Sequence, residues 1–176
     1  MNSSSSSVSG FTIIELMVVV AVAGVLAMIA LPSFKSLTQS QQVKNASFEL
    51  YASLSLARSE AIKRNCDVTI TPQNYSVSFP TPTHNELGWV IASSASCTTV
   101  TTIRNQPQLK GIALTAIPAN TPWVTYQRTG RTTAMAAPTF LIDAYGVTTL
   151  TPYASCIKIE LSGMPRIYKP VNGVCG

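Results

Sequence analysis

One stretch near the N-terminus constrains the fold of this chain more than any other feature, because it is long, apolar and uncharged. No charged residue lies between Glu15 and Lys35, and residues 16–31 consist of apolar side chains and one glycine. Roughly 20 apolar residues in a helix are enough to cross the hydrocarbon core of a bilayer. We therefore expect residues 11–32 to form the transmembrane half of a longer helix, followed by a separate soluble part.

The ten residues before this stretch are polar and repetitive, with the sequence MNSSSSSVSG. They can bury nothing, which is typical of a tag, a leader or a disordered tail, and we interpret residues 1–10 as a leader. A secretory signal has a basic start, a shorter apolar region and a small-residue cleavage site after that region. Here the small residue, Gly10, comes before the apolar stretch. A cut at this point leaves the hydrophobic helix on the mature chain.

The sequence after Pro32 predicts that the helix continues as an amphipathic half over residues 33–65. Apolar residues recur there at three- and four-residue steps, which places them on one face of a helix. This stripe consists of Val43, Ala46, Leu50, Leu54, Ala57 and Ala61. Glu60 can pair with Arg64 four residues later, and Asn65 is a suitable stop. Pro32 has no backbone N–H to donate, so we expect a helix bend near it.

From Cys66 onward the pattern changes to short segments rich in Val, Ile, Thr and Tyr, separated by turn residues. The candidate strands are CDVTIT, YSVSF, GWVIA, TTVTTIR, GIALTAI, WVTYQ, TFLIDA, CIKIE and RIYK. Regular spacing of short strands predicts an antiparallel sheet or sandwich. The expected fold class is therefore α+β, with the amphipathic half of a long N-terminal helix packed on a β-rich globular domain over residues 66–176.

The four cysteines, Cys66, Cys97, Cys156 and Cys175, predict two disulfide bonds. None of them forms a C-x-x-C pair, and the single histidine, His84, has no cysteine close to it, so we expect no zinc site. An even number of cysteines in a domain outside the cytoplasm is typical of disulfides. Three pairings are possible. The pairs Cys66–Cys97 and Cys156–Cys175 are favoured because each closes a short segment.

Charge is distributed unevenly along the chain. All twelve Lys and Arg residues, but only six of the seven acids, lie at or after Lys35, so the soluble part carries a formal charge of +6. The excess of bases is concentrated between residues 104 and 169. A basic surface attracts polyanions such as nucleic acid and anionic lipid head groups. The alternative interpretation is that scattered bases only keep the domain soluble.

No catalytic arrangement stands out, and we predict neither an enzyme nor a cofactor. The chain contains no G-x-S-x-G and no Walker motif. His84 lies in a polar, turn-like stretch, and Asp143 and Glu160 lie far apart in a strand-rich region. General acid–base chemistry needs groups that are held together. The sequence therefore favours a structural or binding role.

The stretch GFTIIELMVVVAVAGVLAMIALPSF resembles the N-terminus of type IV pilins and type II secretion pseudopilins. The resemblance rests on Gly10 before the cut, Phe11 as the new first residue, Glu15 in the first helical turn, and Pro32 in mid-helix. A lone acid at the head of an apolar helix is costly and rare, which makes this pattern specific. The next stretch, FELYASLSLARSEAIKRNCDVTI, resembles the FimT, FimU and GspH branch of minor pilins and pseudopilins, as do GWVIA, WVTYQRTGR and CIKIELSGMPRIYK more loosely.

This resemblance implies the pilin fold, cleavage between Gly10 and Phe11 by a prepilin peptidase, and N-methylation of Phe11. The Glu15 carboxylate would pair with the Phe11 amine of a neighbouring subunit during assembly, and capping of its own helix is the alternative role. The chain would be anchored in the bacterial inner membrane with its C-terminal domain in the periplasm. Counting bases alone predicts the opposite orientation, because Lys35 and Lys44 follow the apolar stretch and the leader has no base.

Three functions fit the resemblance. The first is a minor pilin, a low-copy structural subunit of the pilus that helps to initiate assembly together with other pilin subunits and the inner-membrane assembly platform. The second is a FimT-like DNA receptor for natural transformation. The third is a minor pseudopilin of a type II secretion system, incorporated into a periplasmic pseudopilus.

The DNA-receptor function depends on a few basic residues. In the FimT branch a C-terminal Gly-Arg-x-Arg segment contributes to the contact, whereas residues 163–166 here read Gly-Met-Pro-Arg and lack the first arginine. The candidate DNA-binding residues are Arg128, Arg131, Lys158, Arg166 and Lys169.

Overall fold

The structure is a computed structural model in which the chain divides into two compact units. The N-terminal unit is Met1–Thr38 and the C-terminal unit is Gln39–Gly176. The described residues are 10–73, 88–117, 124–133, 138–147 and 149–175, with the side chains of residues 29–33 outside the description.

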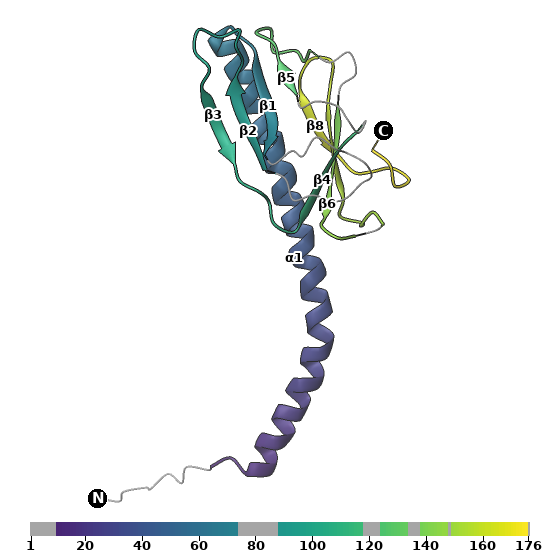
Figure 1. Cartoon of the computed structure of the whole chain (residues 1–176). Coiled ribbons are helices and arrows are strands. Elements are labelled where there is room, and N and C mark those ends of the chain that lie inside the picture. The colour runs from purple at the N-terminus through teal and green to yellow at the C-terminus, as the bar shows by residue number, and fades with distance from the viewer. Residues whose placement is uncertain (1–9, 74–87, 118–123, 134–137, 148, 176) are drawn as a thin grey trace, which may run out of the picture. The chain divides into compact units, whose positions relative to one another are not determined.

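One long helix, α1, runs from Ile13 to Arg64 (Figure 1). It ends as the sequence predicts, because Lys63 and Arg64 occupy the last turn and Asn65 has a left-handed backbone with a φ of 53°. A residue in this conformation commonly ends a helix, and Asn adopts it more readily than most residues. The helical backbone continues through Pro32, whose side chain lies outside the described residues, so the bend near Pro32 stays a prediction.

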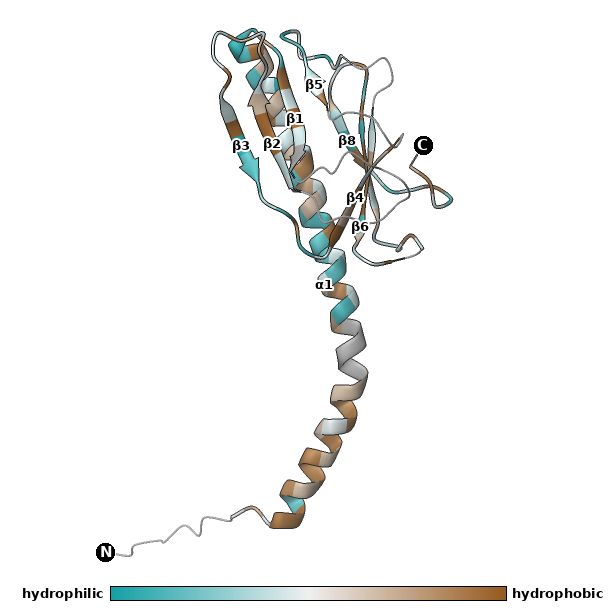
Figure 2. Ribbon diagram, viewed as in Figure 1, coloured by the Kyte–Doolittle hydropathy of each residue, from teal (hydrophilic) through white to brown (hydrophobic). Residues whose placement is uncertain are grey.

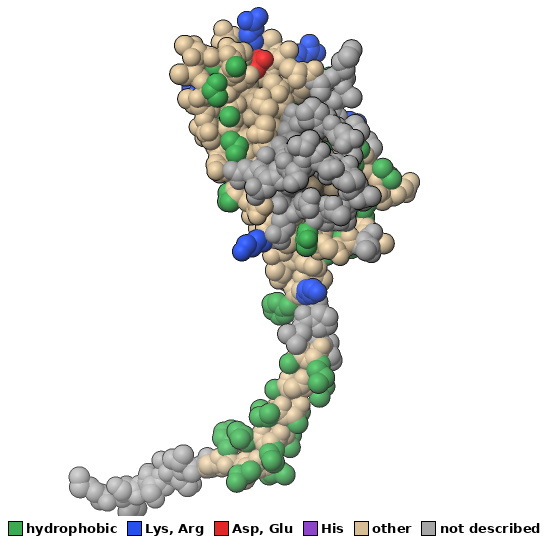
Figure 3. All heavy atoms as spheres, viewed as in Figure 1, with side chains coloured by type: hydrophobic (Ala, Val, Ile, Leu, Met, Phe, Trp, Pro, Cys, Tyr) green, Lys and Arg blue, Asp and Glu red, His purple; other side chains and the backbone are tan. Residues whose placement is uncertain are grey.

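The first half of α1 is strongly apolar (Figure 2). Every side chain from residue 11 to residue 28 is exposed, with Phe11 at 83% and Met28 at 78%. Figure 3 accordingly shows hydrophobic side chains on the surface of this part of the helix. By hydropathy, the described part of the chain contains no helix that is long and apolar enough to cross a membrane.

The second half of α1 buries the apolar stripe that the sequence predicts. All six members of the stripe, from Val43 to Ala61, are at most 4% exposed. Lys44 and Asn45, which lie on other faces of the helix, are exposed. Glu60 and Arg64 form the expected ion pair, with 2.7 Å between Oε2 and Nε. The amphipathic prediction is therefore confirmed.

The first sheet, sheet A, contains strands from both halves of the β-rich region. Its strands are β1 (Val68–Gln73), β2 (Gly88–Ser93), β3 (Thr102–Gln106) and the short β5 (Thr125–Tyr126). They are antiparallel in the order β3-β2-β1-β5. A 3.0 Å hydrogen bond between the hydroxyls of Thr69 and Thr125 joins β1 to β5.

The second sheet, sheet B, is also antiparallel and comes from the remaining four strands. These are β4 (Ile112–Ile117), β6 (Thr139–Ala144), β7 (Ser155–Ile159) and β8 (Pro165–Tyr168). Their order is β4-β6-β7-β8. Strands β7 and β8 form a hairpin whose turn spans residues 160–164.

One hydrophobic core joins α1 to both sheets. The α1 stripe packs with Trp89 and Tyr126 of sheet A and with Phe140 and Ile157 of sheet B. Burying a large apolar side chain contributes roughly 1.5–3 kcal/mol, so this shared core holds the sheets on the helix. The expected α+β pilin fold, a long helix on antiparallel sheets, is confirmed. The candidate strand YSVSF, at residues 75–79, lies outside the described residues.

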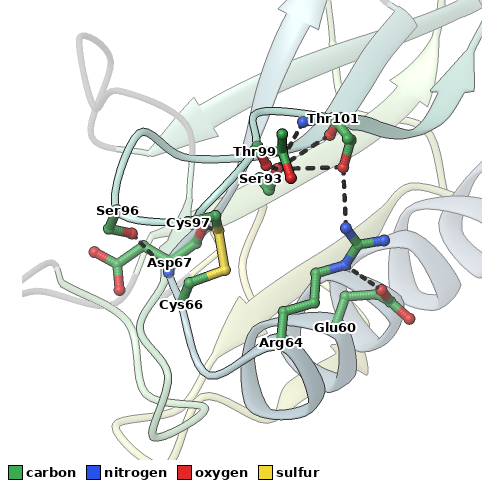
Figure 4. The surroundings of a disulfide bond; sticks show 9 residues. All are labelled: Glu60, Arg64, Cys66, Asp67, Ser93, Ser96, Cys97, Thr99 and Thr101. Atoms are coloured by element: carbon green, nitrogen blue, oxygen red, sulfur yellow. Dashed lines mark hydrogen bonds and ion pairs between the residues drawn. A yellow bond between two sulfur atoms is a disulfide. The ribbon is translucent and has the colours of Figure 1, made fainter.

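Both disulfides join the cysteine pairs that we favoured from the sequence because each pair closes a short segment. Cys66–Cys97 connects the end of α1 to the loop between β2 and β3 (Figure 4). Arg64 supports the same loop, since its Nη1 donates a 2.9 Å hydrogen bond to the hydroxyl of Thr101. Cys156–Cys175 connects the C-terminal segment to β7.

Candidate functional site

The side chain of Thr12 caps the head of α1. The backbone N–H of Glu15 donates a 3.3 Å hydrogen bond to the hydroxyl oxygen of Thr12, immediately before the helix begins at Ile13. The T-x-x-E spacing is the sequence signature of a capping box, and the structure shows the one of its two hydrogen bonds that the Thr12 hydroxyl accepts. Our sequence reasoning considered Glu15 but missed Thr12, although the signal is local and readable.

The Glu15 carboxylate itself remains available to another molecule. Within the described residues it is exposed and takes part in none of the ion pairs. A carboxylate beside an apolar helix is costly unless it is paired or solvated. A cationic partner would stabilise this carboxylate wherever water is excluded from the helix.

The predicted cleavage point lies just before the capping box. Gly10 and Phe11 are exposed and precede the first helical residue, so the peptide bond between them belongs to an accessible, non-helical segment. A side chain at position 10 would meet no neighbouring atom within 4 Å. The geometry is compatible with proteolysis at this bond.

At the other end of α1, two turns meet directly. Gly130 follows β5 and Gly163 lies in the β7–β8 turn, and both have left-handed backbones with φ of 76° and 83°. A Cβ on Gly163 would overlap the carbonyl oxygen of Gly130. Glycine is needed here because the two backbones touch and because left-handed φ strains other residues.

The Arg58 side chain of α1 holds both turns. Its Nε donates a 3.0 Å hydrogen bond to the carbonyl of Gly130, and its Nη2 donates a 3.2 Å bond to the carbonyl of Ser162. The rigid fork of a guanidinium is suited to bridging two fixed acceptors. Arg58 therefore fastens the helix, the end of sheet A and the hairpin of sheet B together. No sequence signal marked it.

Two of the candidate DNA-binding residues lie side by side. Lys158 on β7 is directly opposite Arg166 on β8, and both side chains are exposed. With Glu160, Ile167 and Tyr168 they line a groove of about 460 Å³. Arg166 is not fully available, because its Nη1 pairs with Glu160 Oε1 at 3.2 Å.

Arg128 and Arg131 lie on the turn that follows β5, and this turn contacts the β7–β8 turn. Arg131 Nε donates a 3.4 Å bond to the carbonyl of Leu161. Arg128 is exposed, and no hydrogen bond or ion pair holds it within the described part of the chain. Figure 3 shows Lys and Arg side chains at the end of the C-terminal unit where α1 finishes.

Lys169 lies apart from the other four bases. It follows β8, and its Nζ donates hydrogen bonds of 3.0 and 3.1 Å to the carbonyls of Tyr153 and Ala154, just before β7 begins. It is therefore at the opposite end of the hairpin from the 160–164 turn. Its bonds give it a structural role that the sequence did not suggest.

Asp143, for which the sequence predicted no role, has hydrogen-bond partners in the structure. The buried Asp143 accepts a 2.8 Å hydrogen bond from the backbone N–H of Ala144 and also accepts bonds from the N–H and hydroxyl of Thr151. His84 is outside the described residues. Among the residues that are described, no three His, Cys, Asp or Glu side chains could hold a metal ion.

Two titratable groups near the end of α1 are shifted. The hydrogen bond from Arg64 lowers the pKa of Glu60 below its ordinary value. Burial opposes this as the second-largest effect, and the charges of Lys63 and Arg64 lower the pKa further. Burial strongly raises the pKa of Tyr126, whose hydroxyl has no hydrogen-bond partner in the described structure. Both groups therefore keep their usual charge state at neutral pH.

Two protein families match this chain. The family model of the type II transport protein GspH matches residues 46–163, and the prokaryotic N-terminal methylation motif matches residues 5–31. Two curated relatives, both fimbrial proteins of Pseudomonas aeruginosa, are 40% identical over 74 residues. The match covers 40% of this chain and 47% of each relative, so the chain spans about half the length of the curated relatives it matches.

Solved structures with a similar fold include a minor pilin and a minor pseudopilin. The type IV minor pilin FimU of Pseudomonas aeruginosa has a TM-score of 0.59 and 20% identity, over 75% of this chain and 92% of FimU. The minor pseudopilin EpsH of the type 2 secretion system of Vibrio cholerae has a TM-score of 0.50 and 18% identity, over 72% of this chain and 96% of EpsH. These identities show the fold alone, whereas the family model covers most of the chain. The chain therefore belongs to the family of the type II transport protein GspH, and its N-terminus carries the prokaryotic N-terminal methylation motif.

Proposed function

We propose that this chain is a minor pilin, a low-copy structural subunit near the filament tip that helps to initiate assembly of a type IV pilus. Membership of the family implies assembly with other pilin subunits, and the family and the fold are those of structural pilins rather than enzymes. The observation that carries the proposal is the exposed Glu15 carboxylate at the head of α1, which has no ion-pair partner within the described residues.

The proposed assembly step pairs two charges from different subunits. A prepilin peptidase cuts between Gly10 and Phe11, and the new amine of Phe11 is N-methylated, which preserves its positive charge. The Glu15 carboxylate of one subunit then binds the Phe11 amine of the next. In an apolar surrounding this pair is strongly favoured over an isolated carboxylate. The capping of α1 by Thr12 and the pairing of Glu15 are compatible, because capping uses the Glu15 backbone N–H.

We further propose that residues 11–32 anchor the chain in the bacterial inner membrane, with the C-terminal unit in the periplasm. The N-terminal methylation motif and the family imply this anchorage and orientation. The bases Lys35 and Lys44 count against the orientation, and the two disulfides support it, since disulfides persist in oxidising compartments. The prepilin peptidase and the inner-membrane assembly platform are the proposed partners for processing and assembly.

The proposal is tested by following the tagged full-length chain in a host that makes type IV pili. We expect the chain in filaments sheared from the cell surface, at low copy relative to the major subunit. A host without the prepilin peptidase should retain all of it in the membrane as the uncut precursor. Absence of the chain from filaments in the complete host would overturn the pilus function.

A second candidate function is that of a minor pseudopilin in a type II secretion system. The description of the matching family and the similarity to EpsH favour it. The similarity to two fimbrial proteins favours the pilus instead. The shearing experiment distinguishes the two functions, because a pseudopilin stays in the periplasm, where it supports protein secretion, whereas a pilin is sheared from the cell surface.

A third candidate function is DNA reception, favoured by the exposed Lys158–Arg166 pair on the β7–β8 hairpin and by Arg128. Its contacts would be made to phosphates, because these bases lie on strands and a turn rather than on a helix that could enter a groove of DNA. This function is compatible with the pilus, since a filament subunit can present the same surface.

A further inference from the structure

We infer that the end of the C-terminal unit where α1 enters it contacts anionic lipid head groups of the bilayer that anchors the chain. This inference rests on the anchorage proposed for residues 11–32. The contacting surface, here called the basal surface, combines exposed lysines with exposed apolar side chains. Its members are Lys44, Lys110, Tyr145, Lys169, Val171 and Val174.

The turn after β6 lies beside the first residues of α1 in the C-terminal unit, which begins at Gln39. The N–H of Tyr145 donates a 2.9 Å hydrogen bond to the carbonyl of Gly111. A Cβ on Gly111 would in turn lie 3.4 Å from Oε1 of Gln42 on α1. Tyr145 is 51% exposed, and Lys110, directly before Gly111, is exposed as well. Both side chains therefore belong to the end at which α1 enters.

The C-terminal segment reaches the same end through two separate contacts. The hydroxyl of Tyr153 donates a 2.8 Å hydrogen bond to Oε1 of Gln39, and Nζ of Lys169 donates to the carbonyl of Tyr153. A Cβ on Gly173 would lie 3.9 Å from Cδ1 of Leu150, which is three residues before Tyr153. Lys169 and the residues around Gly173 thus lie near the start of α1 in this unit.

A tight turn holds the two valines of the basal surface. The N–H groups of Val171 and Val174 each donate a 3.0 Å hydrogen bond to the carbonyl of the other valine. Asn172 and Gly173 between them have left-handed backbones, with φ of 51° and 75°, as in a two-residue hairpin turn. The next residue, Cys175, is joined to β7 by its disulfide. The exposed valines are therefore fixed before any contact is made, which lowers the entropic cost of binding.

The charges of the basal surface are positive. Lys44, Lys110 and Lys169 are all exposed. Lys169 uses two of its three ammonium donors on backbone carbonyls, so one donor is left for a phosphate oxygen. Asp143, the acid of β6, is only 2% exposed and accepts hydrogen bonds from its neighbours, so it offsets little of this charge at the surface. Bases held near an anionic bilayer are attracted to it.

This combination of side chains fits the interface of a bilayer better than other partners. A tyrosine ring suits the head-group region, because its ring is apolar and its hydroxyl is polar. Valines can enter the boundary of the acyl chains, while lysines reach the phosphates with their flexible stems. Nucleic acid would make no use of the valines, and an apolar protein surface would make no use of the lysines. An anionic lipid surface uses both.

The proposed anchor keeps the basal surface close to the bilayer. Gln39 follows Pro32 by seven residues, which span at most about 25 Å of fully extended chain. A short tether gives its two ends an effective concentration on the order of millimolar. A contact that would be too weak between separate molecules can therefore form here.

Fluorescence quenching in lipid nanodiscs tests the contact. The full-length chain carries a fluorescent amino acid in place of Val171 or, as the control, in place of Leu161. These side chains are 68% and 70% exposed, and Leu161 lies on the turn at the opposite end of the β7–β8 hairpin. Each disc holds one chain in phosphatidylglycerol and phosphatidylcholine, with nitroxide-labelled head groups as the quencher. We expect stronger quenching at Val171 than at Leu161, and discs of phosphatidylcholine alone should remove most of this difference.

Two substitutions test the two halves of the basal surface. With the probe at Val171, Lys110→Ala should lower the ratio of bilayer-bound to free unit by about fivefold, the effect of losing one base near an anionic surface. With the probe at Tyr145, Val171→Asp should reduce quenching, because a carboxylate is repelled by the same head groups. Both side chains are exposed, so the fold should be retained. Arg128→Ala, at an exposed base of the turn after β5, is the matched control and should change nothing.

The outcomes separate this inference from the proposed anchorage. A chain that does not enter the discs overturns both. If the chain enters the discs and Val171 is quenched no more than Leu161, the basal surface does not contact lipid and the anchorage stands. Quenching that is equal in neutral discs would overturn the role of the anionic head groups. Protection of Val171 from quencher in water that appears only with two chains per disc would assign the surface to a second copy instead.

Discussion

The guanidinium of Arg58 on α1 donates a 3.0 Å hydrogen bond to the carbonyl oxygen of Gly130, a residue 72 positions later in the chain. A second bond, 3.2 Å long, reaches Ser162 at a separation of 104 positions. One side chain thus connects the helix to both β-sheet regions.

We expect Arg58→Ala to destabilise the C-terminal unit by about 1–2 kcal/mol. Hydrogen bonds to charged groups contribute roughly 1.5–3 kcal/mol, and partial exposure reduces that figure here. Arg58→Lys should recover little, because a point charge cannot bridge two carbonyls in a fixed fork. Urea unfolding of the detergent-solubilised chain, followed by tryptophan fluorescence, measures the change. Arg128→Ala is the control, and equal losses for Arg58→Ala and Arg128→Ala would contradict the clamp.

We expect Glu15→Gln to enter the membrane normally and to be excluded from filaments. The Thr12 cap uses the backbone N–H of residue 15, so helix capping is preserved in this variant and only the charge is lost. Thr12→Ala removes the cap, at a cost of about 0.5–2 kcal/mol in helix stability, and retains the charge. Quantitative blotting of membrane and sheared-filament fractions compares the two variants. Incorporation of Glu15→Gln at the unaltered level would show that the carboxylate charge is not needed.

Processing should begin the mature chain at Phe11. The exposed, non-helical segment around Gly10 is accessible to a peptidase, and the apolar helix follows directly. Intact-mass and N-terminal peptide analysis of membrane-extracted protein should find methylated Phe11. A chain that still begins at Met1 in a peptidase-positive host, or one cut after Ala30, contradicts this prediction.

Protein from the periplasm should contain no free thiol under denaturing, non-reducing conditions. The disulfides Cys66–Cys97 and Cys156–Cys175 span sequence separations of 31 and 19 residues. Removing either, by Cys97→Ser or Cys175→Ser, should cost about 2–5 kcal/mol, because each bond restricts the unfolded chain. Thiol labelling and urea unfolding provide the measurements. Labelling of all four cysteines in the unaltered chain would also argue against the periplasmic orientation.

If the C-terminal unit binds DNA, Lys158→Ala and Arg128→Ala should each weaken binding and reduce the salt slope by about 0.9. Neither base has a hydrogen bond or ion pair within the residues described here, so the fold should be unaffected. Lys169→Ala is a poorer test, since Lys169 holds the carbonyls of Tyr153 and Ala154. Fluorescence titration with DNA at two salt concentrations measures the affinity and its salt slope, with Lys44→Ala as the control. Absence of low-salt binding rejects DNA reception.

The sequence by itself determined the elements whose signals are local. The stripe from Val43 to Ala61 specified an amphipathic helix because its period matches the helical repeat, and Asn65 marked the end of that helix. The cap that the Thr12 hydroxyl provides for the Glu15 N–H was equally local, and it was missed only because Glu15 was considered without its neighbour. Short β-branched segments predicted the antiparallel strands, but their order in two sheets could not be read from them.

The tertiary structure alone decided which distant residues meet. Arg58 looks like any helical base in sequence, and its role exists only because Gly130 and Gly163 bring two backbones into contact beside it. Likewise, the sequence groups Lys169 with the other bases of the C-terminal region. Its hydrogen bonds to the segment before β7 show that it lies apart from Lys158. Periodicity and capping act over a few residues, whereas these contacts depend on how the whole chain packs, which no short sequence pattern records.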